Sequence, residues 1–208
     1  MTETLPPPRI SLLVHAAASA LVPVLTDLLE PSPPLTHLLV PQLHASFSQS
    51  SPPSTYRELL QRAASIVQSW DVQDQAEFLA SHPRIGETIG LSSFSGKEQA
   101  PAQGATPGEV LKRLSMLNSL YEEAFPGLRF VTFVNGRPRA AIVPEIEEKL
   151  DLVLPKPSPS TPEPRLFSLQ EKIKIHVVGS KAWRDELNRG LKAMWDIAQS
   201  RLVKMGVE

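Results

Sequence analysis

The chain has 208 residues, of which 41% are hydrophobic, and this is enough to bury the core of one domain. It contains no cysteine, which excludes a disulfide framework, a thiolate metal site and a cysteine nucleophile. The 21 Lys and Arg residues nearly balance the 22 Asp and Glu residues, and no long run of like charge occurs, so a nucleic-acid partner is not expected.

The most apolar stretch, residues 10–29, predicts neither a membrane span nor a signal peptide. It contains His15, Pro23 and Asp27 and falls short of the ~18 uninterrupted apolar residues that a spanning helix needs. The residues before it lack the basic region of a signal peptide. We therefore expect a soluble, cytoplasmic protein with no membrane partner. The chain ends without the Ser-Lys-Leu of peroxisomal import, but a peroxisomal location stays open.

Proline clusters divide the chain, and the segments between them have helical patterns. Residues 55–69 place apolar side chains at three- and four-residue spacing, with Ser54 or Thr55 available as the N-cap. A second helix is expected from Asp71 or Asp74 to Ala80. It must stop at the residue before Pro83, because that residue is pushed out of the α region.

A long helix is predicted to start at Thr106, where the N-terminal signals are clearest. Thr106 can cap the helix, Pro107 suits its first position, and Glu109 completes a capping box. Apolar residues at helical spacing then continue to Phe125, and Pro126 ends the pattern. These signals predict a helix over about residues 106–125.

One segment, residues 129–134, has the β-branched and aromatic composition of a strand and stops at an Asn135-Gly136 turn. A single strand cannot make a sheet, so we expect an extended segment packed inside a helical protein. A further helix is expected from about Pro138 or Pro144 to Leu150.

The sequence predicts a single domain over residues 1–208, organised as an all-α helical bundle. Residues 151–180 are interpreted as a Pro-rich insertion or loop, with the densest prolines between Pro155 and Pro164. A short element between Leu166 and Val178 is expected inside it.

The last predicted helix, from about Lys181 to Met205, carries an arginine on its apolar face. Arg201 follows Trp183 by five helical turns, so at ~100° per residue both point from one stripe. A guanidinium that faces a core must be paired. Two explanations are open: the side chain snorkels to water near the helix end, or it binds an anion at the edge of a buried pocket.

No motif for metal or nucleotide chemistry is present. The sequence contains no HExxH, Walker, GxGxxG or GxSxG pattern, and its histidines are scattered. These histidines are His15, His37, His44, His82 and His176. A metal site is therefore not expected.

Two short stretches, residues 81–87 and 95–99, are candidates for chemistry. His82 precedes a proline and should lie at the turn where a helix ends. Such histidines often only cap the helix, so both a capping and a catalytic role are open. Ser95 and Glu98 are equally compatible with a helix-starting capping box.

Taken in order, these and other stretches resemble one known family. The stretches are Leu29 to Pro33, Ser81 to Gly86, Ser95 to Gln99, Leu117-Asn118 with Tyr121 and Phe125, Phe130 to Gly136, and Ile197-Ala198 with Arg201-Leu202. The set resembles the 2-oxo-4-hydroxy-4-carboxy-5-ureidoimidazoline (OHCU) decarboxylases of urate degradation, over residues 25–202. The chain departs from the commoner HPDL form by Arg84-Ile85, and from compact members by the Pro-rich insertion.

The resemblance implies an all-α fold without a cofactor, with the site between helices and the short extended segment near it. The implied catalytic residues are His82 and Glu98. The implied substrate-binding residues are Pro83, Ser95, Gln99, Phe130, Thr132, Phe133 and Arg201.

The implied activity is that of a carboxy-lyase acting on a small-molecule substrate. OHCU would lose carbon dioxide and give (S)-allantoin through proton transfer by Glu98 and by His82, which we expect to titrate near neutrality. The resemblance also suggests a homodimer, which the sequence alone does not decide. The alternative is a catalytically inactive helical family member that acts as an interaction module through its Pro-rich loops.

Overall fold

The computed structural model describes residues 7–87, 106–160 and 164–207. Within these ranges the chain forms helices and no β-strand, which confirms the predicted all-α fold. The α-helices are α1 (Ile10–Leu13), α2 (Leu21–Leu29), α3 (Val40–Gln49), α4 (Tyr56–Gln68), α5 (Val72–Ala80), α7 (Gly108–Ala124), α8 (Val143–Lys149), α9 (Leu166–Gln170) and α10 (Lys181–Met205). Two 3₁₀ turns, η1 (Ala18–Ala20) and η3 (Arg139–Ala141), and the π-helical turn η2 (Leu35–Leu39) complete the set.

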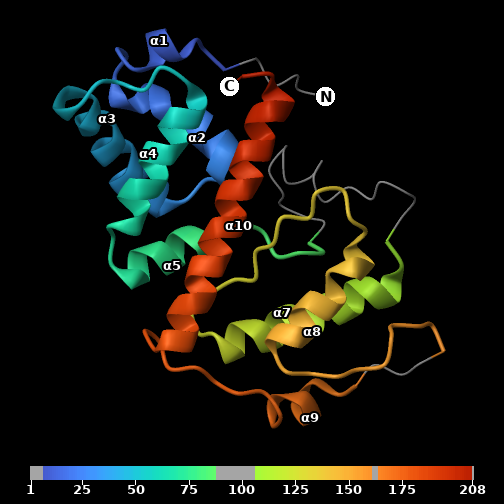
Figure 1. Ribbon diagram of the computed structural model, residues 1–208. Helices are drawn as coiled ribbons and strands as arrows, with labels where there is room; N and C mark the ends of the chain where they lie inside the picture. The colour runs from blue at the N-terminus through green and yellow to red at the C-terminus, as the bar shows by residue number, and fades with distance from the viewer. Residues whose placement is uncertain (1–6, 88–105, 161–163, 208) are drawn as a thin grey trace.

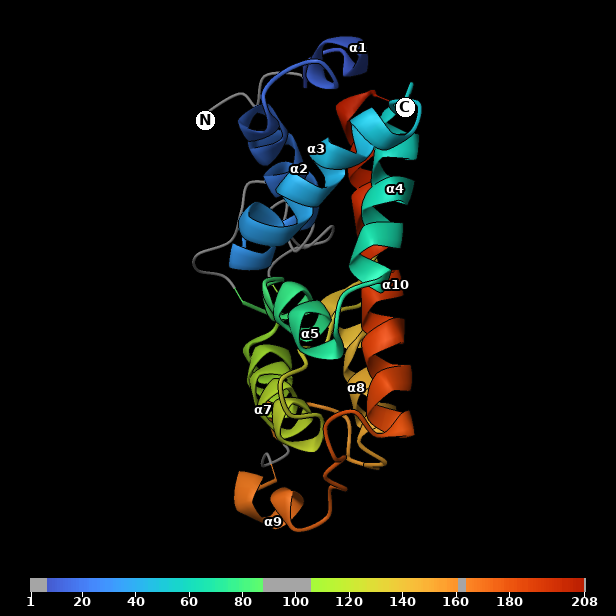
Figure 2. The same ribbon diagram turned by 90° about the vertical axis from the view of Figure 1, so that its left-hand side faces the viewer.

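Helix α10 runs through most of the length of the molecule and joins its two groups of helices (Figure 1). Helices α1 to α4 lie along its C-terminal half, whereas α7 and α8 lie beside its N-terminal half, and α5 lies between the two groups (Figure 2). Direct contacts join α10 to α2, α4 and α5, and α7 to α8 and α9. The last helix therefore packs against elements from the first half of the chain.

The bounds of α10 agree with the sequence prediction because both of its ends are well specified. The Ser180 hydroxyl accepts a hydrogen bond from the Trp183 amide at 3.4 Å, and Gly206 ends the helix with a left-handed φ of 68°. The predicted apolar stripe is buried along most of its length. Its buried members are Trp183, Leu187, Leu191, Met194 and Ala198. No helix among the described residues has both the length and the apolarity needed to cross a bilayer.

Helices α4 and α5 also begin and end as their local signals predict. Thr55 caps α4 by accepting a hydrogen bond from the Glu58 amide at 3.1 Å. Asp71 caps α5 through the amides of Gln73 and Asp74. Helix α5 then ends at Ala80, two residues before His82.

The start of α7 differs from the prediction by one or two residues. The helix begins at Gly108, and Pro107 occupies the N-cap position with an extended ψ of 140° and no side-chain cap. The Thr106 hydroxyl instead accepts a hydrogen bond from Arg139 Nη1 at 3.3 Å. The predicted capping box is therefore wrong, because Thr106 lies one residue too early and has a long-range partner.

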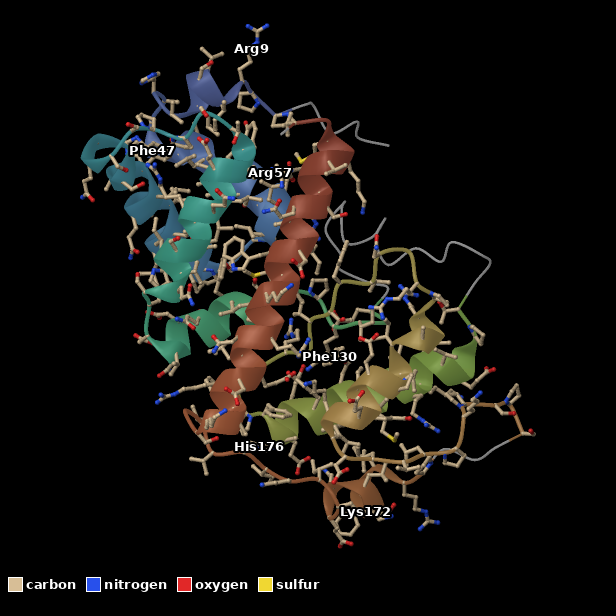
Figure 3. The ribbon with its side chains drawn as sticks, in the orientation of Figure 1. Arg9, Phe47, Arg57, Phe130, Lys172 and His176 are labelled. Atoms are coloured by element: carbon tan, nitrogen blue, oxygen red, sulfur yellow. The ribbon has the colours of Figure 1, made fainter. Side chains whose placement is uncertain are left out.

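Residues 129–134 are extended but pair with no strand in the described ranges, as the sequence predicts. Phe130 is buried between α7 and α10, where it meets the Tyr121 ring edge-on and lies 4.8 Å below the Arg189 guanidinium (Figure 3). The turn that ends the segment has positive φ values at Asn135 and Gly136. The segment therefore crosses the helices and contributes Phe130 to the hydrophobic core.

The remaining elements were predicted in part. The helix expected from residue 138 or 144 to 150 is the short α8, preceded by η3. Within residues 151–180, α9 is the helix that the described part contains. No helix with stated bounds was predicted before Thr55, where α2 and α3 lie.

The Leu79 side chain of α5 packs closely against the backbone of α10 at Gly190. A Cβ atom on Gly190 would lie 2.6 Å from Cδ2 of the buried Leu79, so a larger residue there would force this side chain to shift. Leu79 is one turn before His82. The contact therefore fixes the distance at which α5 presents His82 to α10.

Candidate active site

His82 lies buried directly after α5 and is only 3% exposed. Its amide donates to the Leu79 carbonyl at 3.2 Å, which completes the last turn of the helix. Neither ring nitrogen has a hydrogen-bond partner among the described residues. A buried polar ring without partners is costly, so this imidazole is a candidate for contact with a ligand rather than for helix capping.

Burial and two nearby positive charges keep the His82 ring neutral. Burial is the largest cause, the guanidinium groups of Arg201 and Arg129 follow in that order, and together they lower the pKa of His82 from 6.5 to about 3. The expectation that this imidazole titrates near neutrality is therefore wrong. At neutral pH the ring offers one acceptor and one donor nitrogen.

Arg129 and Glu122 hold the loop that carries His82. Arg129 Nη1 donates to the His82 carbonyl at 2.7 Å, and its Nε lies 3.7 Å from Glu122 Oε1. Glu122 also receives two hydrogen bonds from Arg84, at 2.7 and 2.6 Å. Arg84 stands where the commoner form has an aspartate, and its positive charge is compensated by Glu122 of α7.

Arg201 is 1% exposed and lies well inside the molecule. Its Nη1 donates to the carbonyls of Asp27 at 3.1 Å and Leu28 at 3.2 Å, and its Nη2 donates to Glu30 Oε1 at 2.7 Å. The snorkelling explanation is wrong, because the guanidinium does not reach water. Arg201 is instead fixed at the C-terminal end of α2, where helix carbonyls favour a cation.

The extended segment supplies both main-chain and side-chain groups near Arg129. The Val131 carbonyl accepts from Arg189 Nη1 at 2.9 Å, and the Phe133 carbonyl accepts from Arg137 Nη2 at 2.8 Å. The Thr132 hydroxyl donates to Glu145 Oε2 at 3.1 Å. Phe130 is a core residue by its side chain, so any ligand contact it makes must come from its main chain.

The structure brings two of the predicted site residues, His82 and Arg201, close to each other. His82 and Arg201 interact electrostatically, and Arg129 leads directly into the segment with Phe130, Thr132 and Phe133. Pro83 follows His82 and is half-buried. The predicted residues Ser95, Glu98 and Gln99 lie outside the described residues.

Sequence reasoning missed Arg129, Glu122 and Glu30 as contributors to this region. Arg129 carried a usable signal, since it is a charge at the start of an apolar extended run. Glu30 ends an apolar helix and is 3% exposed, yet its partner Arg201 is 171 residues away. Among the described residues, no three His, Asp or Glu side chains converge as a metal site.

Comparison with known proteins identifies the family. A family model described as "OHCU decarboxylase" matches residues 15–158, well over half of the chain. The chain belongs to the OHCU decarboxylase family. The match covers His82, Arg129 and Glu30, whereas Arg201 lies beyond it.

A curated relative supports the same assignment. It is the uric acid degradation bifunctional protein of Bacillus sp. (strain TB-90), which is 28% identical over 100 residues. The match covers 48% of this chain and only 20% of the relative. The name of that protein refers to uric acid degradation.

Proposed function

We propose that this chain is a cofactor-independent carboxy-lyase that converts OHCU into (S)-allantoin during urate breakdown. The observation that carries the proposal is the buried His82 ring, whose nitrogens have no described partner and which lies beside two guanidinium groups. This arrangement suits an anionic substrate that must exchange protons in a site shielded from water.

The substrate itself can accept the electron pair that loss of carbon dioxide releases. A carboxylate and a hydroxyl share one ring carbon, and the adjacent ring carbon is part of a C=N bond. When the bond to the carboxylate breaks, its electron pair moves toward that C=N bond and carbon dioxide leaves. The nitrogen of that C=N bond gains a proton, the hydroxyl proton is lost as a carbonyl forms, and a further proton is added to the carbon that carries the ureido group. The net change is the replacement of carbon dioxide by a proton.

The charges around His82 fit the first part of this reaction. Arg201 and Arg129 supply positive potential for the substrate carboxylate. Burial and these two charges lower the pKa of His82, and a bound carboxylate would offset the charges and make the imidazole a stronger base. His82 would then accept the hydroxyl proton more readily when substrate is present.

The other predicted residues complete the proposal. Glu98 would orient His82 or deliver the proton to carbon, and Ser95 and Gln99 would hold the ring and ureido edges. Pro83 and the main chain of Phe130, Thr132 and Phe133 would line the remaining ligand surface. Positioned proton transfer of this kind typically contributes ~10²- to 10⁴-fold in rate.

The test is direct production of the chiral product. Urate oxidase and hydroxyisourate hydrolase generate OHCU from urate in situ, and circular dichroism follows (S)-allantoin. We expect a signal that exceeds spontaneous decay and that His82→Asn abolishes without unfolding the protein. His176→Asn is the matched control, because His176 stacks on Phe125 at 4.5 Å at the far end of α10 (Figure 3). Equal rates in the parent and in His82→Asn would contradict the assignment.

The second candidate is an inactive family member that acts as an interaction module. It is favoured by apolar side chains left exposed in and after α9. These are Phe167 at 72%, Ile175 at 59%, Val177 at 76% and Val178 at 55%. A parent protein that produces no (S)-allantoin above the spontaneous background would favour this candidate.

A further inference from the structure

Glu30 is a buried carboxylate held in an unusual backbone conformation. It follows the last residue of α2, is 3% exposed, and has φ 68° and ψ 149°. That region is populated almost only by glycine, and such strain persists where the surroundings enforce it. A strained glutamate at this position needs an explanation beyond helix termination.

The explanation lies in its contact with Arg201. Glu30 Oε1 accepts from Arg201 Nη2 at 2.7 Å, and the side chains are only 4% and 1% exposed. Because the Asp27 and Leu28 carbonyls take Nη1, the guanidinium is fixed from two directions. The Asp27 carboxyl belongs to the same charge group: burial raises its pKa, Arg201 lowers it and Glu30 raises it.

We propose that Glu30 is a positioning residue that fixes Arg201 and balances its charge, so that the arginine holds a substrate carboxylate without over-stabilising it. This inference rests on the proposed function. Decarboxylation turns a carboxylate into neutral carbon dioxide, so an uncompensated cation would stabilise the substrate more than the transition state. The carboxylate of Glu30 reduces that difference.

Glu30→Gln separates this role from a merely structural one. The glutamine oxygen can still accept from Arg201 Nη2, and the two carbonyl contacts are unaffected, so charge is the main loss. We expect KM and kcat both to fall, each by about tenfold, which is the pattern of a removed ground-state destabilisation. Structural damage would lower kcat or the active fraction without tightening substrate binding.

Three further variants keep the test decisive. Glu30→Asp retains the charge and should stay within about twofold of the parent in KM. Asp27→Asn removes a half-buried carboxylate that has no side-chain hydrogen bond to Arg201, and it should shift KM and kcat in the same direction by a smaller factor. Asp27→Asn provides the test if Glu30→Gln does not fold. Glu147→Gln is the matched control, since it discharges an equally close partner of the buried Arg113, at 2.7 Å, outside the candidate site.

The readout is kcat and KM in the coupled (S)-allantoin assay. Lower KM with lower kcat in Glu30→Gln or Asp27→Asn, and an unchanged KM in Glu147→Gln, support the inference. An unchanged or higher KM in the folded Glu30→Gln and Asp27→Asn proteins overturns it while the proposed function stands. If the parent enzyme gives no turnover, the proposed function fails and this inference falls with it.

Discussion

The depressed pKa of His82 makes a quantitative prediction about stability as well as catalysis. In the unfolded chain the imidazole binds a proton below pH 6.5, whereas in the folded protein it does so only near pH 3. The unfolded state therefore takes up the extra proton as the pH falls. The contribution of the neutral ring to stability is complete above pH 6.5 and is lost between pH 6.5 and pH 3.

The size of the effect follows from the two pKa values. One unit of pKa difference corresponds to about 1.4 kcal/mol, so the full loss by pH 3 is on the order of 5 kcal/mol. Between pH 7 and pH 5 the same linkage removes about 2 kcal/mol. That amount is large enough to measure in a domain of this size.

Urea denaturation of the parent and of His82→Asn at pH 7 and pH 5 measures this loss. Groups other than residue 82 contribute equally to both proteins, so the difference between the two isolates the imidazole. We expect the parent to lose about 2 kcal/mol more than the variant on going to pH 5. A gap between the two proteins that is the same at both pH values would refute the reasoning.

Two other predictions follow from contacts around His82. Gly190→Ala should destabilise the fold by about 1–2 kcal/mol, because the new Cβ would lie 2.6 Å from Leu79 Cδ2 and the overpacking outweighs the better helix propensity of alanine. Thermal unfolding measures this loss. A melting temperature equal to or above that of the parent would show that Leu79 moves freely. Arg129→Met should raise the pKa of His82 by removing one nearby cation, so the acid limb of kcat/KM should move to higher pH. A superimposable pH profile would mean that Arg129 acts on the loop alone.

The helices could be predicted where their own residues supply the periodicity and the capping groups. The approximate bounds predicted for α10 agree with the observed helix because its periodicity is encoded locally, and the structure shows Ser180 and Gly206 as its caps. The start of α7 was misplaced because Thr106 bonds to Arg139, a partner 33 residues away that no local pattern reveals. Local signals thus fail where a distant side chain competes for a capping group.

The site shows the same contrast between local signals, which could be predicted, and contacts between distant residues, which could not. The position of Arg201 on the apolar stripe predicted that it must be paired if buried, and it is buried and paired. The identity of the partner, Glu30, depends on how α2 meets α10, which the sequence does not state. Likewise, the pKa of His82 depends on burial and on two arginines from distant segments, so the unperturbed value was a poor guide.

The place of α10 in the chain has a consequence for biosynthesis. Helix α5 ends at Ala80, and the helix it packs against begins at Lys181. At about 5–20 residues per second, a ribosome needs roughly 5–20 s to bridge that interval. During this time the apolar faces of α2, α4 and α5 and the carboxylate of Glu30 are not yet covered by α10. Holdase chaperones should therefore recognise this chain during translation, and the site should form only after Arg201 has left the exit tunnel.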